Sequence, residues 1–207
     1  MKPRVLKTVN LLKTKYPEAI CSLIYSDPFQ LLIATRLSAQ CTDARVNMVT
    51  PALFARFPDA ESMAVASLSE VENLIKSCGL YKTKAKSIVE CAGQIINDFG
   101  GNVPDNMDDL LKLKGIGRKT ANLIMGDVYG KPAVVADTHF LRICGRLGFI
   151  NTKDPYKAEL IMKKLLPPSE SSDFCHRLVL FGREICTARA PKCGECLLFE
   201  ICPSQGI

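Results

Sequence analysis

Four cysteines near the carboxyl end of the chain have a spacing that can hold a metal centre. They are separated by six, two and five residues, at Cys186, Cys193, Cys196 and Cys202. The short central step contains Gly194, which eases the tight turn that lets two sulfurs converge. Zinc and a [4Fe-4S] cluster both accept four cysteines. Structural zinc sites usually show two short pairs, so one short pair with wider outer gaps favours the iron–sulfur cluster, while four ordinary buried cysteines do not fit so polar a segment.

A second group of residues can bind an anion. The segment 110–121 places Gly115 and Gly117 between two apolar helical stretches, and Arg118 and Lys119 follow directly. Two glycines one residue apart permit a turn that exposes consecutive backbone N–H groups. Those donors and the N-terminus of the next helix form a site for an anion such as a DNA phosphate. A plain helix corner with two solvated cations is the simpler alternative, but the flanking apolar helices favour the anion site.

A third group is a carboxylate at the start of a helix. The extended apolar strip that begins at Val134 leads to Asp137, and His139 follows within the next turn. The pattern alone predicts that Asp137 is a helix N-cap, a position where Asp is preferred. A catalytic role is compatible with capping, since the cap fixes the carboxylate in place. For His139, packing or a hydrogen bond is the expected role rather than metal binding.

The elements that position these residues are predicted to be helices. Apolar residues recur at helical spacing from Val5 to Tyr16 and from Ala85 to Phe99, and Gly100-Gly101 ends the second stretch. The one extended stretch, residues 132–136, is too short to build a sheet. We therefore expect an all-α protein of about ten helices joined by short loops. Further helix starts are predicted at Asp27-Pro28, Thr42-Asp43, Ser67 (with a stop at Cys78-Gly79), on either side of residues 114–117, near Asp137, at Asp154-Pro155 and near Ser172.

Composition bounds the class of protein. Hydrophobic residues are 47% and charged residues 23% of 207 residues, which excludes a disordered tail protein, a collagen-like fibre and a disulfide-stapled miniature. No apolar run approaches the roughly 20 residues that a membrane helix needs. The start of the chain shows no signal peptide, so we expect a reducing, cytoplasmic location where clustered cysteines more often bind metal than pair. A net charge of +6 suits a phosphate-bearing partner but is weak evidence alone.

Taken together, these residues resemble the endonuclease III family, the DNA-repair glycosylase/lyases of the helix-hairpin-helix superfamily. The resemblance runs from Asp27 to Cys202 and includes the 6-2-5 cysteine spacing, which in this family holds a [4Fe-4S] cluster. Its other markers are Leu37-Ser38-Ala39-Gln40 with Thr42-Asp43, Cys78-Gly79-Leu80-Tyr81, the hairpin from Gly115 to Asn122, and Asp137-Thr138-His139.

The resemblance implies an architecture. It predicts two helical lobes with a cleft between them: a helical barrel over residues 22–132 that ends in the helix-hairpin-helix motif, and an iron–sulfur cluster domain formed by residues 1–21 plus 133–207. Both catalytic residues are expected to face the cleft. The cluster is expected to be structural or redox-sensing, and to shape the loop from Thr187 to Lys192 against the DNA backbone.

The resemblance also implies an activity. It identifies Lys119 as the catalytic lysine and Asp137 as the catalytic aspartate of a bifunctional N-glycosylase for oxidised pyrimidines, with lyase cleavage through a Lys119 Schiff base. A lysine amine attacks only when neutral, and we expect the helix start near Arg118 together with partial burial to favour that form. The partner is double-stranded DNA with a damaged or abasic nucleotide, and a monomer associated with the nucleoid is expected. The DNA-binding residues implied are Gln40, Leu80, Gly115, Gly117, Arg118, Arg189 and Lys192.

Three alternatives remain. A relative acting on mismatched uracil or thymine would use a similar site. Relatives acting on adenine opposite oxidised guanine lack a lysine at the position of Lys119 and carry a further C-terminal domain, whereas this sequence stops five residues after Cys202. A non-catalytic, metal-stabilised DNA-binding module would need only the hairpin and its charge, and the presence of both Lys119 and Asp137 argues against it.

Overall fold

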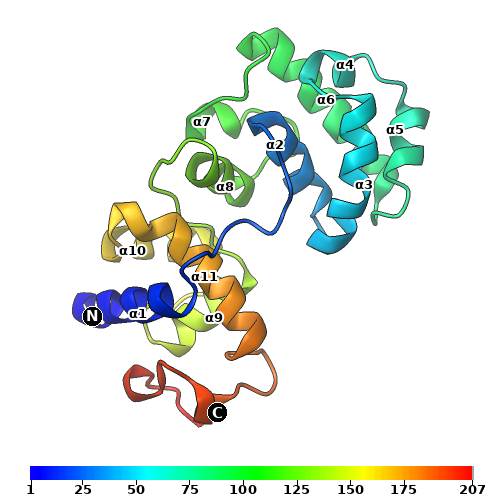
Figure 1. Ribbon diagram of the computed structural model, residues 1–207. Helices are drawn as coiled ribbons and strands as arrows, with labels where there is room; N and C mark the ends of the chain where they lie inside the picture. Colours follow the sequence, from blue (N-terminus) through cyan, green and yellow to red (C-terminus); the bar gives the residue numbers. More distant parts are fainter. Residues whose placement is uncertain (207) are drawn as a thin grey trace. The chain divides into compact units, whose positions relative to one another are not determined.

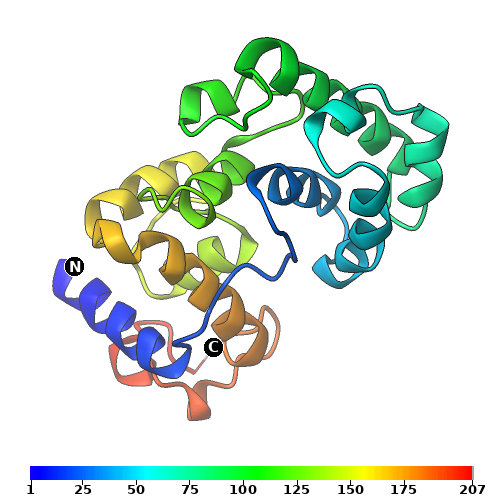
Figure 2. The same cartoon turned by 45° about the horizontal axis from the view of Figure 1, so that its top comes forward.

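The computed structural model describes residues 1–206, which form helices and loops without a strand, as the all-α prediction requires. The chain divides into two compact units, Ser22–Tyr129 and Met1–Cys21 with Gly130–Ile207 (Figures 1 and 2). The predicted domains differ from these units in where residues 130–132 are placed. Over the described residues, no helix is long and apolar enough to cross a membrane.

Helix α2 is the centre of the unit Ser22–Tyr129. It contacts α3, α6 and α8, and seven of its ten residues are buried. A helix that is apolar on every side is stable only when other helices surround it, which explains this central position. The unit contains α2 (Pro28–Leu37), α3 (Asp43–Arg56), α4 (Ala60–Ala64), α5 (Leu68–Leu74), α6 (Tyr81–Phe99), α7 (Met107–Leu110) and α8 (Arg118–Asp127).

The N-terminal capping residues predicted for α2 and α3 are confirmed. The Asp27 carboxylate accepts the Gln30 backbone N–H at 2.8 Å, and the Gln30 side-chain oxygen accepts the Ser26 N–H at 3.1 Å. Thr42 caps α3 by accepting the Arg45 N–H at 3.3 Å. These short-range bonds satisfy backbone donors that have no partner within the helix, so the sequence alone is enough to locate them.

Two predictions about the segment that follows α3 are wrong. Helix α4 lies where none was predicted, capped by Asp59, which exchanges hydrogen bonds with Ser62 rather than with the Glu or Gln of the usual motif. Helix α5 ends at Leu74 and not at Cys78-Gly79. The Ser67 hydroxyl bonds the Ser69 hydroxyl at 2.8 Å and leaves α5 without a side-chain cap.

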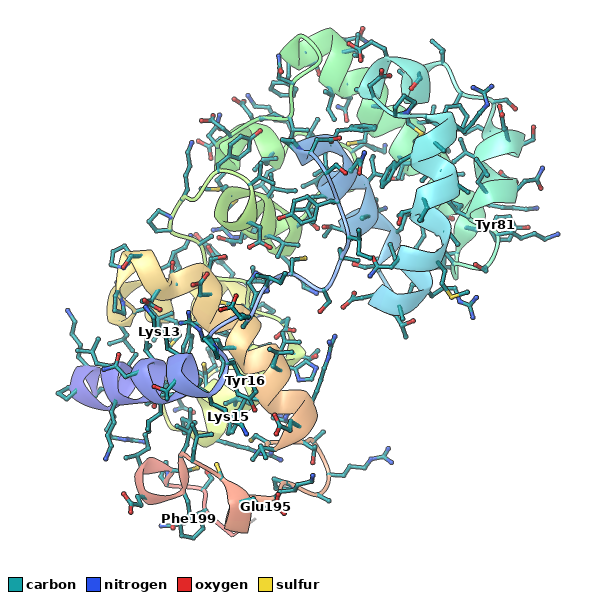
Figure 3. The ribbon with its side chains drawn as sticks, viewed as in Figure 1. Lys13, Lys15, Tyr16, Tyr81, Glu195 and Phe199 are labelled. Carbon is teal, nitrogen blue, oxygen red and sulfur yellow. The ribbon has the colours of Figure 1, made fainter. Side chains whose placement is uncertain are left out.

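The other unit is arranged around α11, which contacts α1 and α9. Tyr16, labelled in Figure 3 at the end of α1, donates from its hydroxyl to Glu184 at 2.7 Å. Glu170 accepts from Lys13 of α1 and from Arg177 of α11, whose side chain is only 3% exposed. The unit contains α1 (Lys2–Lys15), α9 (Thr138–Arg146), α10 (Pro155–Leu165), η1 (Pro168–Glu170), α11 (Ser171–Glu184), η2 (Cys193–Glu195) and η3 (Phe199–Ile201).

Candidate functional site

The hairpin between α7 and α8 requires glycine at its first glycine position. Gly115 has a φ of +74°, and a Cβ there would lie 2.5 Å from the Arg36 Nε and 2.6 Å from the Ser87 Oγ. Arg36 donates its Nε–H to the Ser87 hydroxyl at 2.9 Å. This bond holds the Arg36 and Ser87 side chains in place against the backbone of Gly115. Any side chain at Gly115 would displace this contact as well as strain the backbone.

The second glycine of the hairpin, Gly117, is not required by backbone strain or by packing. Gly117 is extended, with φ −106° and ψ 174°, and caps α8 without a side chain to bond the first turn. No atom from elsewhere in the described chain lies within 4 Å of the position a Cβ would take. The chain's own packing therefore requires glycine at Gly115 but not at Gly117. The prediction that both glycines are needed for the tight turn holds only for Gly115. The open space lets an external group reach the exposed start of α8.

A glutamine that the sequence analysis did not single out supports the hairpin. The Gln94 side-chain oxygen on α6 accepts the Lys114 N–H at 2.5 Å, and its amide donates to the Lys112 carbonyl at 3.4 Å. The Lys114 ammonium lies 4.0 Å from Glu90. In the sequence, Gln94 is a polar residue beside the apolar stripe of α6. That position is the one sequence signal that could have indicated its role in supporting the hairpin.

Lys119 lies in the first turn of α8 and its side chain is exposed. It forms no ion pair with any residue of the described chain. The predicted partial burial is therefore wrong. The buried face of α8 begins at Ala121 and continues through Asn122 to Ile124, so a side chain in the first turn projects beyond the packed part of the helix.

Asp137 is the N-cap of α9, as the pattern predicts. Its Oδ1 accepts the Phe140 backbone N–H at 2.7 Å, and the residue is half-buried. His139 lies 3.2 Å from an Arg142 guanidinium nitrogen through its Nδ1, which confirms the predicted hydrogen-bonded histidine. Lys119 belongs to the unit Ser22–Tyr129 and Asp137 to the other unit.

The structure brings Gln40 and Leu80 together within one unit. They are the only non-glycine residues with positive φ over residues 1–206, at 54° and 59°. Both are exposed, Leu80 by 61%. A Cβ on Gly79 would lie 3.6 Å from the Gln40 carbonyl oxygen, so the two loops are in backbone contact. Left-handed backbone at a bulky residue is costly and concentrates at functional sites.

The four clustered cysteines line one cavity, with about 420 Å³ of empty space that is partly open to solvent. Burial raises the pKa of the Cys196 thiol, the hydrogen bond from the Leu198 N–H lowers it, and the other three thiols raise it. Among residues 1–206, no three His, Cys, Asp or Glu side chains converge closely enough for a single ion. A tetrahedral zinc site would need that convergence, whereas a [4Fe-4S] cluster binds its sulfurs at separate corners. The donor set therefore fits the cluster.

Two arginines of α9 hold the first part of the cysteine segment. Arg142 donates to the Cys186 carbonyl at 2.9 Å, and Arg146 donates to the Thr187 and Ala188 carbonyls at 2.7 and 3.0 Å. An Arg146 nitrogen also lies 3.3 Å from the Cys186 sulfur. Neither arginine was predicted to have this role, because nothing in the local sequence distinguishes an arginine that bonds a distant loop from a solvated one.

Beyond these bonds the loop presents free positive charge. Arg189 and Lys192 are exposed and form no ion pair with described residues. Glu195 and Phe199, labelled in Figure 3, mark the segment that follows, in η2 and η3. The exposed cations and the cysteine cavity thus belong to one short stretch of chain.

Comparison with known proteins gives consistent results. Residues 33–168 match the family model described as HhH-GPD superfamily base excision DNA repair protein, and residues 186–202 match the iron-sulfur binding domain of endonuclease III. Endonuclease III of Synechocystis sp. is 46% identical over 98% of this chain and 93% of its own. A solved non-covalent endonuclease III–DNA complex and a trapped endonuclease III–DNA covalent intermediate, an estranged-adenine complex, are each 39% identical, with a TM-score of 0.93 over 99% of this chain and 96% of theirs.

Proposed function

The chain belongs to the endonuclease III family of the HhH-GPD superfamily, and from this premise we propose that it is a bifunctional DNA glycosylase and abasic-site lyase of base-excision repair. Its substrate is double-stranded DNA that carries an oxidised pyrimidine or an abasic nucleotide. It acts as a monomer, at the nucleoid in the cytoplasm. The trapped covalent intermediate of a relative supports the covalent mechanism.

The observation that carries the proposal is the position of Lys119. Its exposed amine stands in the first turn of α8, directly after a hairpin whose Gly117 is open to an external group. A phosphate bound at that helix start would bring the deoxyribose of a neighbouring nucleotide toward the amine. A structural lysine would instead pair with a carboxylate or cover apolar surface, and Lys119 has no ion pair over the described residues.

The reaction follows from the chemistry of an amine at the sugar. A base inside a duplex cannot be reached, so the damaged nucleotide turns out of the stack. The neutral Lys119 Nζ attacks C1′, the C1′–N bond breaks, and the base leaves with the bonding electrons and takes up a proton. The ring opens to a Schiff base between Nζ and C1′. Loss of a proton from C2′ then expels the 3′ phosphate and nicks the strand 3′ to the lesion.

Asp137 serves the same step from the other unit. As the N-cap of α9 it is held with one carboxylate oxygen on the Phe140 N–H, which leaves the second oxygen for the reaction. We assign to it the removal of a proton from the Lys119 ammonium and the stabilisation of positive charge that develops on the sugar. This assignment requires the two units to bring Lys119 and Asp137 to the same nucleotide.

The remaining residues bind the DNA. The N–H groups around Gly115, Gly117 and Arg118 bind phosphate, and Arg189 and Lys192 bind the backbone through charge. Gln40 and Leu80 enter the stack where the base has left, and their left-handed backbone projects both side chains from adjacent loops.

Cys186, Cys193, Cys196 and Cys202 would hold the [4Fe-4S] cluster. When bound, the cluster fixes the fold of its segment and supplies no hydrolytic chemistry. The chain's own contribution is the pair of arginines, Arg142 and Arg146, that bond the carbonyls of residues 186–188 and so orient the loop with the exposed cations.

A panel of lesions tests the proposal. Duplexes containing thymine glycol, an abasic site, or mismatched uracil or thymine are incubated with the protein, and base release and strand cleavage are measured separately. We expect release of thymine glycol and cleavage of the abasic strand. Release of only the mismatched bases would favour the mismatch glycosylase, and binding without release or cleavage would favour a DNA-binding module. Relatives at 39–46% identity make these alternatives the less favoured ones.

A further inference from the structure

Two cysteines outside the cluster segment flank the loops of Gln40 and Leu80. Cys41 follows Gln40 directly, and Cys78 precedes Gly79 and Leu80. Cys41 is half-exposed, whereas Cys78 is only 1% exposed. Neither residue has a role in the proposed reaction or in the cysteine cavity.

The two cysteines adjoin the contact between the loops. The backbones of Gly79 and Gln40 approach closely enough that a Cβ on Gly79 would lie 3.6 Å from the Gln40 carbonyl oxygen. Burial raises the pKa of Cys78 to about 11, and the adjacent Cys41 thiol raises it as well. The contact between the loops therefore places the two cysteines close together, with Cys41 half-exposed and Cys78 buried.

We propose that Cys41 and Cys78 are a site of reversible oxidation, at which a low-molecular-weight disulfide such as oxidised glutathione converts the two thiols into a Cys41–Cys78 disulfide that weakens the binding of lesion DNA. The disulfide itself follows from the position of the two thiols. Its consequence for DNA rests on the proposed function of Gln40 and Leu80.

The chemistry is thiol–disulfide exchange in two steps. The Cys41 thiol loses its proton to water, and the thiolate attacks one sulfur of oxidised glutathione and releases a first glutathione thiolate. The released glutathione thiolate takes the proton of the Cys78 thiol, and the Cys78 sulfur then attacks the Cys41 sulfur and releases the second glutathione as a thiolate, which is protonated by water. Two protein thiols lose two electrons in total, and one glutathione disulfide becomes two glutathiones. Only Cys41 must meet the reagent, because the second step is intramolecular.

The surrounding structure determines the effect of this bond. The Lys84 side chain is only 2% exposed, and its ammonium donates to the Leu37 carbonyl at 2.8 Å. This hydrogen bond connects the start of α6 to the end of α2. A covalent bond brings two sulfurs to about 2 Å, well inside van der Waals contact. Because Lys84 fixes the helix ends, the loops that contain Gln40 and Leu80 must take up that movement, which alters the presentation of both side chains.

The other unit offers an internal comparison. Burial raises the pKa of the Cys144 thiol well above its usual value, and Cys175 adds a smaller effect in the same direction. Both are buried, at 0% and 4% exposure. Exchange cannot start without a reachable thiol, so this pair should stay reduced under conditions that oxidise Cys41 and Cys78.

The test uses the cluster-containing protein treated with oxidised glutathione. Peptide mapping without reductant should find the Cys41 and Cys78 peptides linked and the Cys144 and Cys175 peptides free. Affinity for a duplex with a stable abasic analogue should fall about tenfold or more, and dithiothreitol should restore it. Cys41→Ser should bind like the reduced protein with or without glutathione, and Cys78→Ala should show only the Cys41–glutathione adduct.

Each contrary result is informative. Absence of the Cys41–Cys78 link, or a linked protein that binds with unchanged affinity, would overturn the proposal. Weakened binding that persists in glutathione-treated Cys41→Ser would assign the effect to another cysteine and overturn it too. Failure of the reduced protein to bind the abasic duplex would instead count against the proposed function, because the mapping of the disulfide needs no DNA.

Discussion

At the scale of single residues, the backbone of Gln40 and Leu80 is the feature that ordinary folding does not explain. Both side chains are exposed, so burial does not repay a left-handed conformation at either position. Such strain costs about 1–2 kcal/mol per residue and persists only where the surrounding structure imposes it. Gly79 and the bond from Lys84 to the Leu37 carbonyl provide that constraint. The proposed DNA-binding role of both residues would account for the retained strain.

Leu80→Gly separates stability from binding. Glycine removes the left-handed strain of about 1–2 kcal/mol but gives the unfolded chain more freedom, which costs roughly 0.5–1 kcal/mol. We therefore expect the free energy of unfolding to rise by about 0.5–1 kcal/mol. Affinity for lesion DNA should fall, because the side chain that we propose to enter the stack is gone. Urea denaturation and DNA titration measure the two effects. Val65→Gly, at a residue that is 84% exposed with φ −100°, is the matched control and should lower stability while binding is unchanged.

Asp137 can be tested for a role beyond capping. Asn is as good an N-cap as Asp, so Asp137→Asn should change stability by less than about 0.5 kcal/mol. Glycosylase activity should fall by about 100-fold or more, since the amide cannot accept a proton. Asp137→Ala should lose the activity and also about 1 kcal/mol of stability. An Asn variant that keeps full base-release activity would reduce Asp137 to a cap.

Residues of the candidate site were predictable where a local pattern sets their position. The cap at Asp137 and the glycine at the Gly115 turn follow from neighbouring residues, and the structure places them so. The exposure of Lys119 did not follow, since burial depends on which face of α8 packs. Gln94 and Arg146 were missed because their partners are distant in sequence.

At the scale of elements, helix starts follow from the sequence better than helix ends. Asp27 and Thr42 cap their helices through bonds to residues three positions away. The end of α5 at Leu74 has no such signal, and Cys78-Gly79 instead forms the loop that leads into Leu80. The central position of α2 was also not predictable in detail, because an apolar stretch does not specify its neighbours.

The junction of α1, η1 and α11 gives a pH-dependent prediction. Burial raises the pKa of Glu170, but the bonds from Lys13 and Arg177 lower it more, so the net pKa lies below its usual value of about 4.3. A lowered carboxyl pKa stabilises the fold above the unfolded-state value, and the contribution disappears as the pH falls through the folded-state value. The stabilisation by Glu170 should therefore be complete near neutrality and lost in acid.

Glu170→Gln measures that contribution. It leaves the buried Arg177 with Asp173 as its carboxylate partner, so the free energy of unfolding at pH 7 should fall by about 2 kcal/mol. The difference between wild type and variant should shrink as the pH is lowered below about 4. Glu70→Gln breaks the exposed pair with Arg56 and should cost less than about 0.5 kcal/mol. A difference that grows in acid would contradict this account.

At the scale of the whole molecule, the distribution of cations matters more than the net charge of +6. Lys119 lies at the hairpin of one unit, and Arg189 and Lys192 lie on the cysteine segment of the other. None of the three has an ion pair within residues 1–206. The all-α fold and the cysteine cavity agree with the prediction from sequence. The central claim of the proposed function is the covalent chemistry of Lys119, whose amine forms a Schiff base with the sugar.

Borohydride trapping on an abasic duplex tests that claim most directly. Reduction of the Schiff base should yield a stable protein–DNA adduct, and peptide mapping should locate it on Lys119. Lys119→Gln should abolish the adduct while the variant still folds and binds DNA, and Lys112→Gln, which removes an exposed lysine paired with Asp109 just before the hairpin, should leave it intact. An adduct that persists in Lys119→Gln, or a wild-type protein that binds the duplex and gives none, would contradict the account.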